Sequence, residues 1–135
     1  MTCVGLLAFA GMAIAHGTEK HGKTAQDDVL MKKLHAMMPM FSQASAQIET
    51  ALGKGDTPVV ASEGEKILAA VPDLKKSKPH KNIKQRKKYV ELAGVLGTTV
   101  STTVDLAKKG DFAGAKEAFR KVEEVCAACH ATFRD

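Results

Sequence analysis

The sequence predicts an all-α fold, specifically an antiparallel up-down-up-down four-helix bundle. Apolar residues recur at spacings of three and four in four separate segments, and no segment alternates polar and apolar residues as a half-buried strand does. Short links rich in Gly, Asp and Pro join these segments, which favours antiparallel neighbours. The 135 residues suit one domain with a single hydrophobic core.

The first helix is expected over residues 25–53. Asp27 and Asp28 favour its positive N-terminal end, and Gly53-Lys54-Gly55 ends it. Pro39 removes one backbone hydrogen bond inside the helix, which predicts a local kink or π-bulge. The apolar stripe of this helix is expected to consist of Leu30, Leu34, Met38, Phe41, Ser45, Ile48 and Leu52.

The second helix is expected to begin at Asp56 or Thr57, because either side chain can cap a helix. Pro58 then lies in the first turn, where its missing N–H does no harm. Pro72 is expected to end this helix, since proline disrupts a helix interior.

The third and fourth helices follow a basic linker that contains Pro79. The third is expected over residues 81–109, and Gly110 closes it. Asp111 is expected to cap the fourth helix. The apolar side of this last helix comprises Ala115, Phe119, Val122, Val125, Cys126, Cys129 and Phe133.

The N-terminus predicts export. Residues 4–15 form an apolar run that is too short to span a bilayer, and Ala13-Ile14-Ala15 resembles a cleavage site. We therefore expect residues 1–15 to be a signal peptide and residues 16–135 to form the mature, periplasmic domain, with no membrane span after removal of the leader. A retained N-terminal anchor is the alternative, since Met1-Thr2-Cys3 carries no basic residue.

The motif Cys126-Ala127-Ala128-Cys129-His130 carries the chemistry of this chain. Cys-x-x-Cys-His is the attachment site of a c-type haem, in which two thiols bond to the porphyrin and the histidine binds the iron. In a helix, positions 126, 129 and 130 share one face, so all three can meet one flat ligand. Zinc usually needs a second Cys or His pair, and a thioredoxin-like site needs a βαβ unit; the sequence offers neither. Two buried cysteines beside a surface histidine are the remaining alternative.

The bundle topology predicts where this cofactor lies. The end of the fourth helix lies beside the start of the first and of the third, so haem is expected at that end of the bundle, near residues 28–41 and His80. A sixth ligand is expected among the methionines of the first helix, because a His/Met pair is typical of electron carriers. Among these methionines, Met38 lies on the apolar stripe and Met37 lies on the flank of the stripe. His80 is the rival ligand, and methionine as core filler is the alternative for the whole cluster.

The other methionines near this end are weaker candidates for the sixth ligand, and two basic residues are candidates for contacts with the haem propionates. Met31 lies on the right face but close to the helix start, and Met40 points further away. His35 is expected on the flank of the helix. Arg134 and Lys33 are candidate partners for haem propionates, because basic side chains suit carboxylates.

These residues together resemble the class II c-type cytochromes, which include the high-spin cytochromes c′ and the low-spin cytochrome c556 type. The resemblance rests on a four-helix bundle whose haem motif lies a few residues from the C-terminus and is followed by Phe133-Arg134. It implies one haem c per chain, bound through Cys126 and Cys129 with His130 as proximal ligand. Low-spin members take a methionine of the first helix as sixth ligand, and a bulge at Pro39 would bring Met38 to that place. The resemblance therefore makes Met38 the first choice and Met37 the second. High-spin members leave the site open and bind NO or CO.

The predicted function is therefore one-electron transfer rather than enzymatic catalysis, with five-coordinate NO or CO binding as the alternative. The net charge is +5, and the basic residues of the segment from Lys75 to Lys88 are expected to attract acidic redox partner proteins, unless they are only a solvated loop. Nucleic-acid binding is not expected of an exported chain with one tyrosine and no tryptophan. The resemblance adds a homodimer, the habit of the family.

Overall fold

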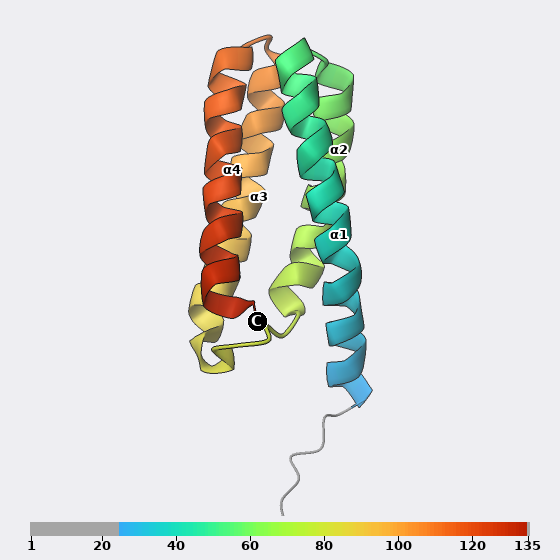
Figure 1. Cartoon of the computed structure of the whole chain (residues 1–135), viewed down its shortest axis with the longest axis vertical. Coiled ribbons are helices and arrows are strands. Elements are labelled where there is room, and N and C mark those ends of the chain that lie inside the picture. Colours follow the sequence, from blue (N-terminus) through green and yellow to red (C-terminus); the bar gives the residue numbers. More distant parts are fainter. Residues whose placement is uncertain (1–24, 135) are drawn as a thin grey trace, which may run out of the picture.

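The computed structural model describes residues 25–134, and within this range every regular element is a helix. Successive helices run antiparallel and pack side by side, and the fourth returns beside the first (Figure 1). This arrangement confirms the predicted all-α four-helix bundle. The elements are α1 (Ala25–Lys54), α2 (Thr57–Lys76), the 3₁₀ turn η1 (Ile83–Gln85), α3 (Arg86–Lys108) and α4 (Phe112–Phe133). None of these helices is long and apolar enough to cross a bilayer.

The helix caps form as the sequence predicts. Asp56 caps α2 by accepting a hydrogen bond from the backbone N–H of Val59 at 3.2 Å. Asp111 caps α4 by accepting from Gly114 N at 2.8 Å. Gly55 and Gly110 follow α1 and α3 at positive φ, which only glycine adopts without strain.

Two predicted helix ends are wrong. The helix α2 does not end at Pro72 but continues to Lys76, because this last turn buries Leu74 in the core, and that burial offsets the lost hydrogen bond of proline. The helix α3 begins at Arg86 rather than near residue 81, because Asn82 adopts a left-handed conformation with φ 54° that no α-helix accommodates.

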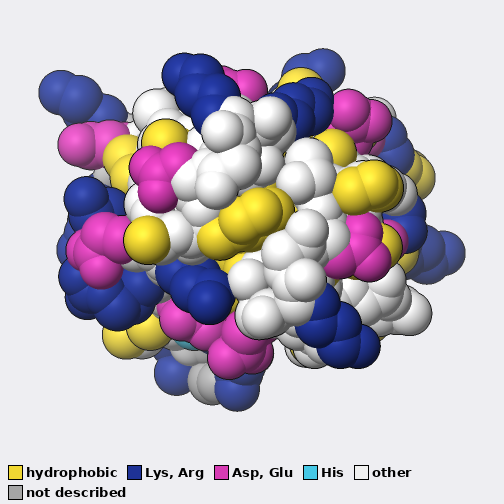
Figure 2. Space-filling view, turned by 90° about the horizontal axis from the view of Figure 1, so that it is seen from above, with side chains coloured by type: hydrophobic (Ala, Val, Ile, Leu, Met, Phe, Trp, Pro, Cys, Tyr) yellow, Lys and Arg dark blue, Asp and Glu magenta, His cyan; other side chains and the backbone are white. Residues whose placement is uncertain are grey.

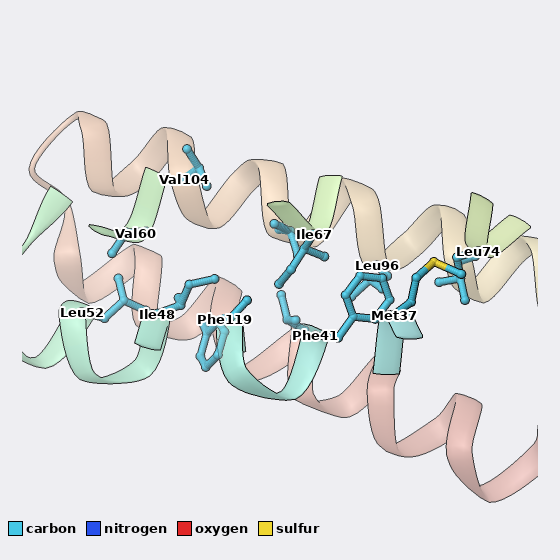
Figure 3. Packing of buried hydrophobic residues seen from close by; sticks show 14 of the residues in the cluster. Met37, Phe41, Ile48, Leu52, Val60, Ile67, Leu74, Leu96, Val104 and Phe119 are labelled. Atoms are coloured by element: carbon cyan, nitrogen blue, oxygen red, sulfur yellow. The ribbon is translucent and has the colours of Figure 1, made fainter. Parts of the chain in front are cut away.

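The core runs the length of the bundle and corrects the predicted stripe of α1. The buried side chains of α1 are Leu34, Met37, Phe41, Ala44, Ile48, Ala51 and Leu52. Figure 3 shows Met37 packed inside the bundle near Leu74. Met37 is only 8% exposed and belongs to the core, whereas Met38 is half-buried beside it. The two methionines therefore exchange the places that the sequence predicts for them.

Pro39 produces no π-bulge. The helix α1 is α-helical through Pro39, and residues 25–134 contain no π-helical turn. Because proline has no N–H, the carbonyl of His35 still lacks its usual helical donor. The bulge that the resemblance required to place Met38 is therefore absent, and the position of Met38 follows from ordinary helical geometry.

Candidate cofactor site

A cavity of about 600 Å³ lies between α1 and α4, at the end of the bundle that holds the C-terminus. Figure 1 shows these two helices further apart at this end than at the opposite one. The volume of the cavity is typical of sites for small molecules and cofactors. The lining is mostly apolar, with Leu34, Phe41, Leu74, Leu92, Leu96, Val122 and Val125 among its residues. The structure thus has a cavity where the sequence predicts the cofactor.

The α4 side of the cavity carries the haem motif. Cys126, Cys129 and His130 all line the cavity, as their helical spacing predicts. Both cysteines are half-buried free thiols. The Asp111 cap and the buried Phe119 fix the register of α4, so the same helix face that packs on the core continues into the motif. Two thiols and one imidazole are the donor set that covalent haem attachment needs.

The surroundings keep these three side chains neutral. Burial raises the pKa of the Cys126 thiol, and the nearby carboxylate of Glu123 raises it further. Burial also raises the pKa of Cys129. His130 is exposed overall, but partial burial lowers its pKa, and the positive charge of Arg134 lowers it further. A neutral imidazole has a free nitrogen lone pair, which metal binding requires.

The α1 side of the cavity presents one methionine. Met38 lines the cavity, together with Pro39, which cannot act as a ligand. Met37 points into the core, while Met31 and Met40 are half-buried against it and do not line the cavity. The structure therefore brings Met38, rather than Met37, to the space in front of the haem motif.

Two histidines from distant parts of the chain also meet at this cavity. His35 of α1 and His80 of the α2–α3 loop both line it, with their Nε2 atoms 3.3 Å apart and their ring planes inclined by 15°. At this distance one Nε2–H can donate to the other ring, so the two side chains hold each other in place. The sequence predicts the position of His80 but places His35 on the flank. In the sequence His35 lies three residues before Met38, and this spacing could have indicated that both share one face of the helix.

The floor of the cavity contains a buried tyrosine that the sequence analysis did not single out. Tyr89 is 2% exposed, and its ring packs edge-on against Phe133. Its phenol lies 2.7 Å from Ser77 Oγ, which itself donates to the carbonyl of Leu74 at 2.7 Å. Since the hydroxyl of Ser77 has one proton, Tyr89 donates and Ser77 accepts. Burial raises the pKa of Tyr89, so the phenol stays protonated.

The α2–α3 loop is fixed to the end of α4. The backbone N–H of Lys81 donates to Phe133 O at 3.2 Å, and Asn82 Nδ2 donates to Thr132 O at 2.6 Å. Both bonds satisfy carbonyls that the end of a helix leaves without partners. Arg86 anchors the other side of the loop by donating to the carbonyls of Lys75 and Ser77. The loop that carries His80 is therefore held against the helix that carries the haem motif.

The two predicted propionate partners differ in position. Arg134 lines the cavity at the end of α4. Lys33 does not line it, because its ammonium points to α2 and forms an ion pair with Asp73 at 3.3 Å. The structure thus favours Arg134 over Lys33 as a contact for a carboxylate at the cavity.

The comparisons with known proteins give one match. The model of the family described as Cytochrome C' matches residues 28–134 of the chain. The matched residues include α1 from Asp28 onwards, the whole of α2, α3 and α4, and every residue that lines the cavity. No curated protein and no solved structure gives a significant match. In the described part of the chain, no group of three or more His, Cys, Asp or Glu side chains lies together as a site for a bare metal ion.

Proposed function

Because the chain belongs to the cytochrome c′ family, we propose that it is a periplasmic one-electron carrier with one covalently bound haem c. Cys126 and Cys129 hold the haem by thioether bonds, and His130 is the proximal ligand of its iron. Met38 is the sixth ligand. The observation that carries this assignment is that Met38 lines the cavity from α1 while Cys126, Cys129 and His130 line it from α4.

The donor set and the lining suit electron transfer. The haem supplies a one-electron Fe(III)/Fe(II) couple, and the protein supplies its ligands and surroundings. A thioether is a soft ligand that favours the reduced metal, and the apolar side chains around the cavity exclude water, so both raise the reduction potential. Electron transfer requires no side chain that makes or breaks bonds, so the proposed function needs only the ligands and the apolar lining of the cavity.

A five-coordinate protein that binds NO or CO is the second candidate. One observation favours it: Leu34 and Pro39 line the same side of the cavity as Met38, and neither can bind iron. If one of these faces the iron in place of Met38, the sixth position is open to a small gas molecule. The spin state of the haem separates the two functions.

The test is the visible spectrum of the purified holoprotein, oxidised and reduced, with and without CO. A carrier with His130/Met38 ligation gives low-spin spectra that CO does not change, and Met38→Ala converts the haem to a high-spin form that binds CO. Met37→Ala is the matched control, because Met37 packs in the core; it lowers the free energy of unfolding by about 2–5 kcal/mol but leaves the haem low-spin.

Three results would contradict the assignment. A high-spin wild-type protein that binds CO supports the gas-binding candidate. Loss of the low-spin spectrum in Met37→Ala but not in Met38→Ala transfers the role to Met37. The same loss in His80→Ala alone makes the rival histidine the sixth ligand.

The cellular location is tested separately, because the proposed signal peptide lies outside the described residues. Covalent haem attachment and export belong together in this proposal. Fractionation of the host cells, followed by mass spectrometry of the mature chain, is expected to find the protein in the periplasm with its N-terminus at His16. A membrane-bound chain that keeps residues 1–15 would support the retained anchor instead.

A further inference from the structure

The surface beside the cavity combines an exposed apolar side chain with a group of lysines. Ile83 is 60% exposed, which is the highest value among the large hydrophobic residues of the described chain. It lies in η1, between the exposed lysines of the loop and of the first turn of α3. We call this the basic loop surface; it consists of Lys81, Ile83, Lys84, Lys87 and Lys88.

We propose that the basic loop surface docks an acidic redox partner protein, with Ile83 as its apolar centre and the lysines as its rim. The inference rests on the proposed electron-carrier function and names the partner of the same site. An apolar contact inside a charged rim is the usual composition of a protein–protein interface. The charged rim speeds the encounter and orients it, and the apolar centre holds the complex.

The charge of this surface is only partly offset within the protein. Asp27 and Asp28 of α1 line a small pocket together with Lys78 and Ile83. The segment 75–88 contains eight basic residues and no acidic one. Two of the eight have internal roles: Arg86 donates to backbone carbonyls, and Lys78 pairs with Asp27 at 2.6 Å. None of the ion pairs found among residues 25–134 involves Lys84, Lys87 or Lys88. These lysines remain exposed, where they can meet a partner of opposite charge.

The opposite end of the bundle has no comparable run of basic residues. Figure 2 views that end, and acidic side chains lie among the basic ones there. The links between α1 and α2 and between α3 and α4 bring acids such as Asp56 and Asp111 close to Lys54, Lys108 and Lys109 in the sequence. The basic excess is therefore local to the end of the bundle that contains the cavity.

The position of the lysines works against helix stability, which points to a role outside folding. The first turn of α3 carries Arg86, Lys87 and Lys88 and no acidic residue. The N-terminus of a helix is the positive end of its dipole, so cations there are unfavourable. Arg86 is compensated by its bonds to the carbonyls at the end of α2, but no ion pair of the described residues compensates Lys87 or Lys88.

The surface also adjoins the cofactor cavity and is fixed to it. Pro79 and His80, which precede the surface directly, line the cavity. Lys81 and Asn82 bond to the last carbonyls of α4, the helix that carries the haem motif. A protein docked on Ile83 would thus lie at the rim of the haem cavity, where electron transfer needs it.

A protein is a better occupant than a membrane or a nucleic acid. Ile83 is a single apolar side chain in a three-residue 3₁₀ turn, whereas binding in a membrane interface requires the broad apolar face of an amphipathic helix. Single-stranded nucleic acids stack on exposed aromatic rings, and the large hydrophobic residues exposed in the described chain are all aliphatic: Val29, Ile83 and Val95.

The test compares two triple charge reversals with the same net charge. Lys84→Glu/Lys87→Glu/Lys88→Glu changes the basic loop surface, and Lys54→Glu/Lys108→Glu/Lys109→Glu changes the opposite end. Stopped-flow kinetics measure electron transfer from the reduced holoproteins to hexacyanoferrate(III), an anion, and to tris(phenanthroline)cobalt(III), a cation. The first variant is expected to slow the anion reaction at least about tenfold at low salt and to speed the cation reaction. The control is expected to change either rate less than about threefold.

A binding measurement tests the apolar centre without electron transfer. The probe is a fluorescein-labelled, Glu-rich peptide with one central Leu, and its anisotropy is followed with oxidised protein over a range of salt concentrations. Ile83→Ser is expected to weaken binding about fivefold or more, with the same salt dependence as the wild type. Circular dichroism checks that all variants fold.

Each failure has its own signature. Equal effects of the two triple variants would show that only net charge matters and overturn the docking surface. Unchanged peptide binding in Ile83→Ser would remove the apolar centre. Tighter, Ile83-dependent binding to phosphatidylserine vesicles than to the peptide would make a lipid surface the occupant. A wild-type protein that reduces neither complex contradicts the proposed carrier function itself, whatever the peptide does.

Discussion

Asn82 offers a direct test of how the α2–α3 loop is fixed to the haem-bearing helix. Its side chain donates from Nδ2 to Thr132 O at 2.6 Å, and its backbone is left-handed with φ 54°. Asn82→Gly removes the hydrogen bond but accepts the backbone conformation. Asn82→Ala removes the bond and also places a Cβ in the left-handed region.

The two substitutions separate two energies. The lost hydrogen bond costs about 0.5–1.5 kcal/mol in either variant. The left-handed backbone costs alanine about 1 kcal/mol more. We therefore expect Asn82→Gly to lower the free energy of unfolding by about 0.5–1.5 kcal/mol and Asn82→Ala by about 1.5–2.5 kcal/mol.

The measurement is denaturant unfolding of the holoproteins, followed by far-UV circular dichroism at matched pH and salt. Both variants should unfold at lower denaturant concentrations than the wild type, with unchanged slopes. Equal losses for Gly and Ala would show that the backbone at this position is not left-handed in solution. No loss in either would show that the Asn82 side chain does not hold the loop, which would leave only the bond from Lys81 N to Phe133 O between the loop and the end of α4.

Two further predictions concern packing and pH. A Cβ on Gly64 would lie 2.4 Å from Val104 Cγ2. Overpacking of this kind costs about 1–3 kcal/mol, and alanine gains about 1 kcal/mol over glycine in helix propensity. Gly64→Ala should therefore lower the free energy of unfolding by up to about 2 kcal/mol. A Cβ on Gly53 meets nothing within 4 Å, so Gly53→Ala should instead raise the free energy of unfolding by up to about 1 kcal/mol. Thermal unfolding that shows higher stability for both variants would contradict the close contact between Gly64 and Val104. Burial raises the pKa of Tyr89 above 10.0, so the folded state holds the phenol proton more tightly than the unfolded state does. The stability that this proton contributes is fully present below pH 10 and is lost as the pH rises through the pKa of the folded state. Tyr89 is the only tyrosine, so phenolate absorbance measures its titration directly. Tyr89→Phe should lack this alkaline loss of stability, and a phenol that titrates at its ordinary pKa would refute the burial of the Tyr89 hydroxyl.

Local signals in the sequence were sufficient where one interaction decides the structure. Asp56 and Asp111 cap their helices because a carboxylate directly before a helix has few better partners than its free N–H groups. The haem motif lies on one face of α4 because helical spacing leaves no choice. The family followed from this motif and from the four helices, and the family match agrees with it.

Sequence signals failed where tertiary packing competes with local preference. Pro72 predicts the end of α2, but the following turn buries Leu74 and extends to the carbonyls that Arg86 binds. Nothing local to Pro72 reveals those contacts, because Arg86 lies beyond a loop. The pairing of His35 with His80 likewise joins residues 45 positions apart, so no window of sequence contains both.

The burial of Met37 in place of Met38 shows where a single apolar stripe misplaces residues of α1. The buried residues of α1 follow a regular repeat of three and four, namely Leu34, Met37, Phe41, Ala44, Ile48 and Ala51, and the two alanines hid it among larger apolar residues. A second row, formed by His35, Met38, Ser42 and Ser45, lies beside the first and lines the cavity. The predicted apolar stripe took Met38 and Ser45 from this second row and most of its other residues from the first. In α1 one row packs in the core and the adjacent row lines the cavity, so a single apolar stripe drawn through both mixes residues with different surroundings. Met38 belongs to the second row, which is why the proposed sixth ligand lines the cavity while Met37 packs in the core.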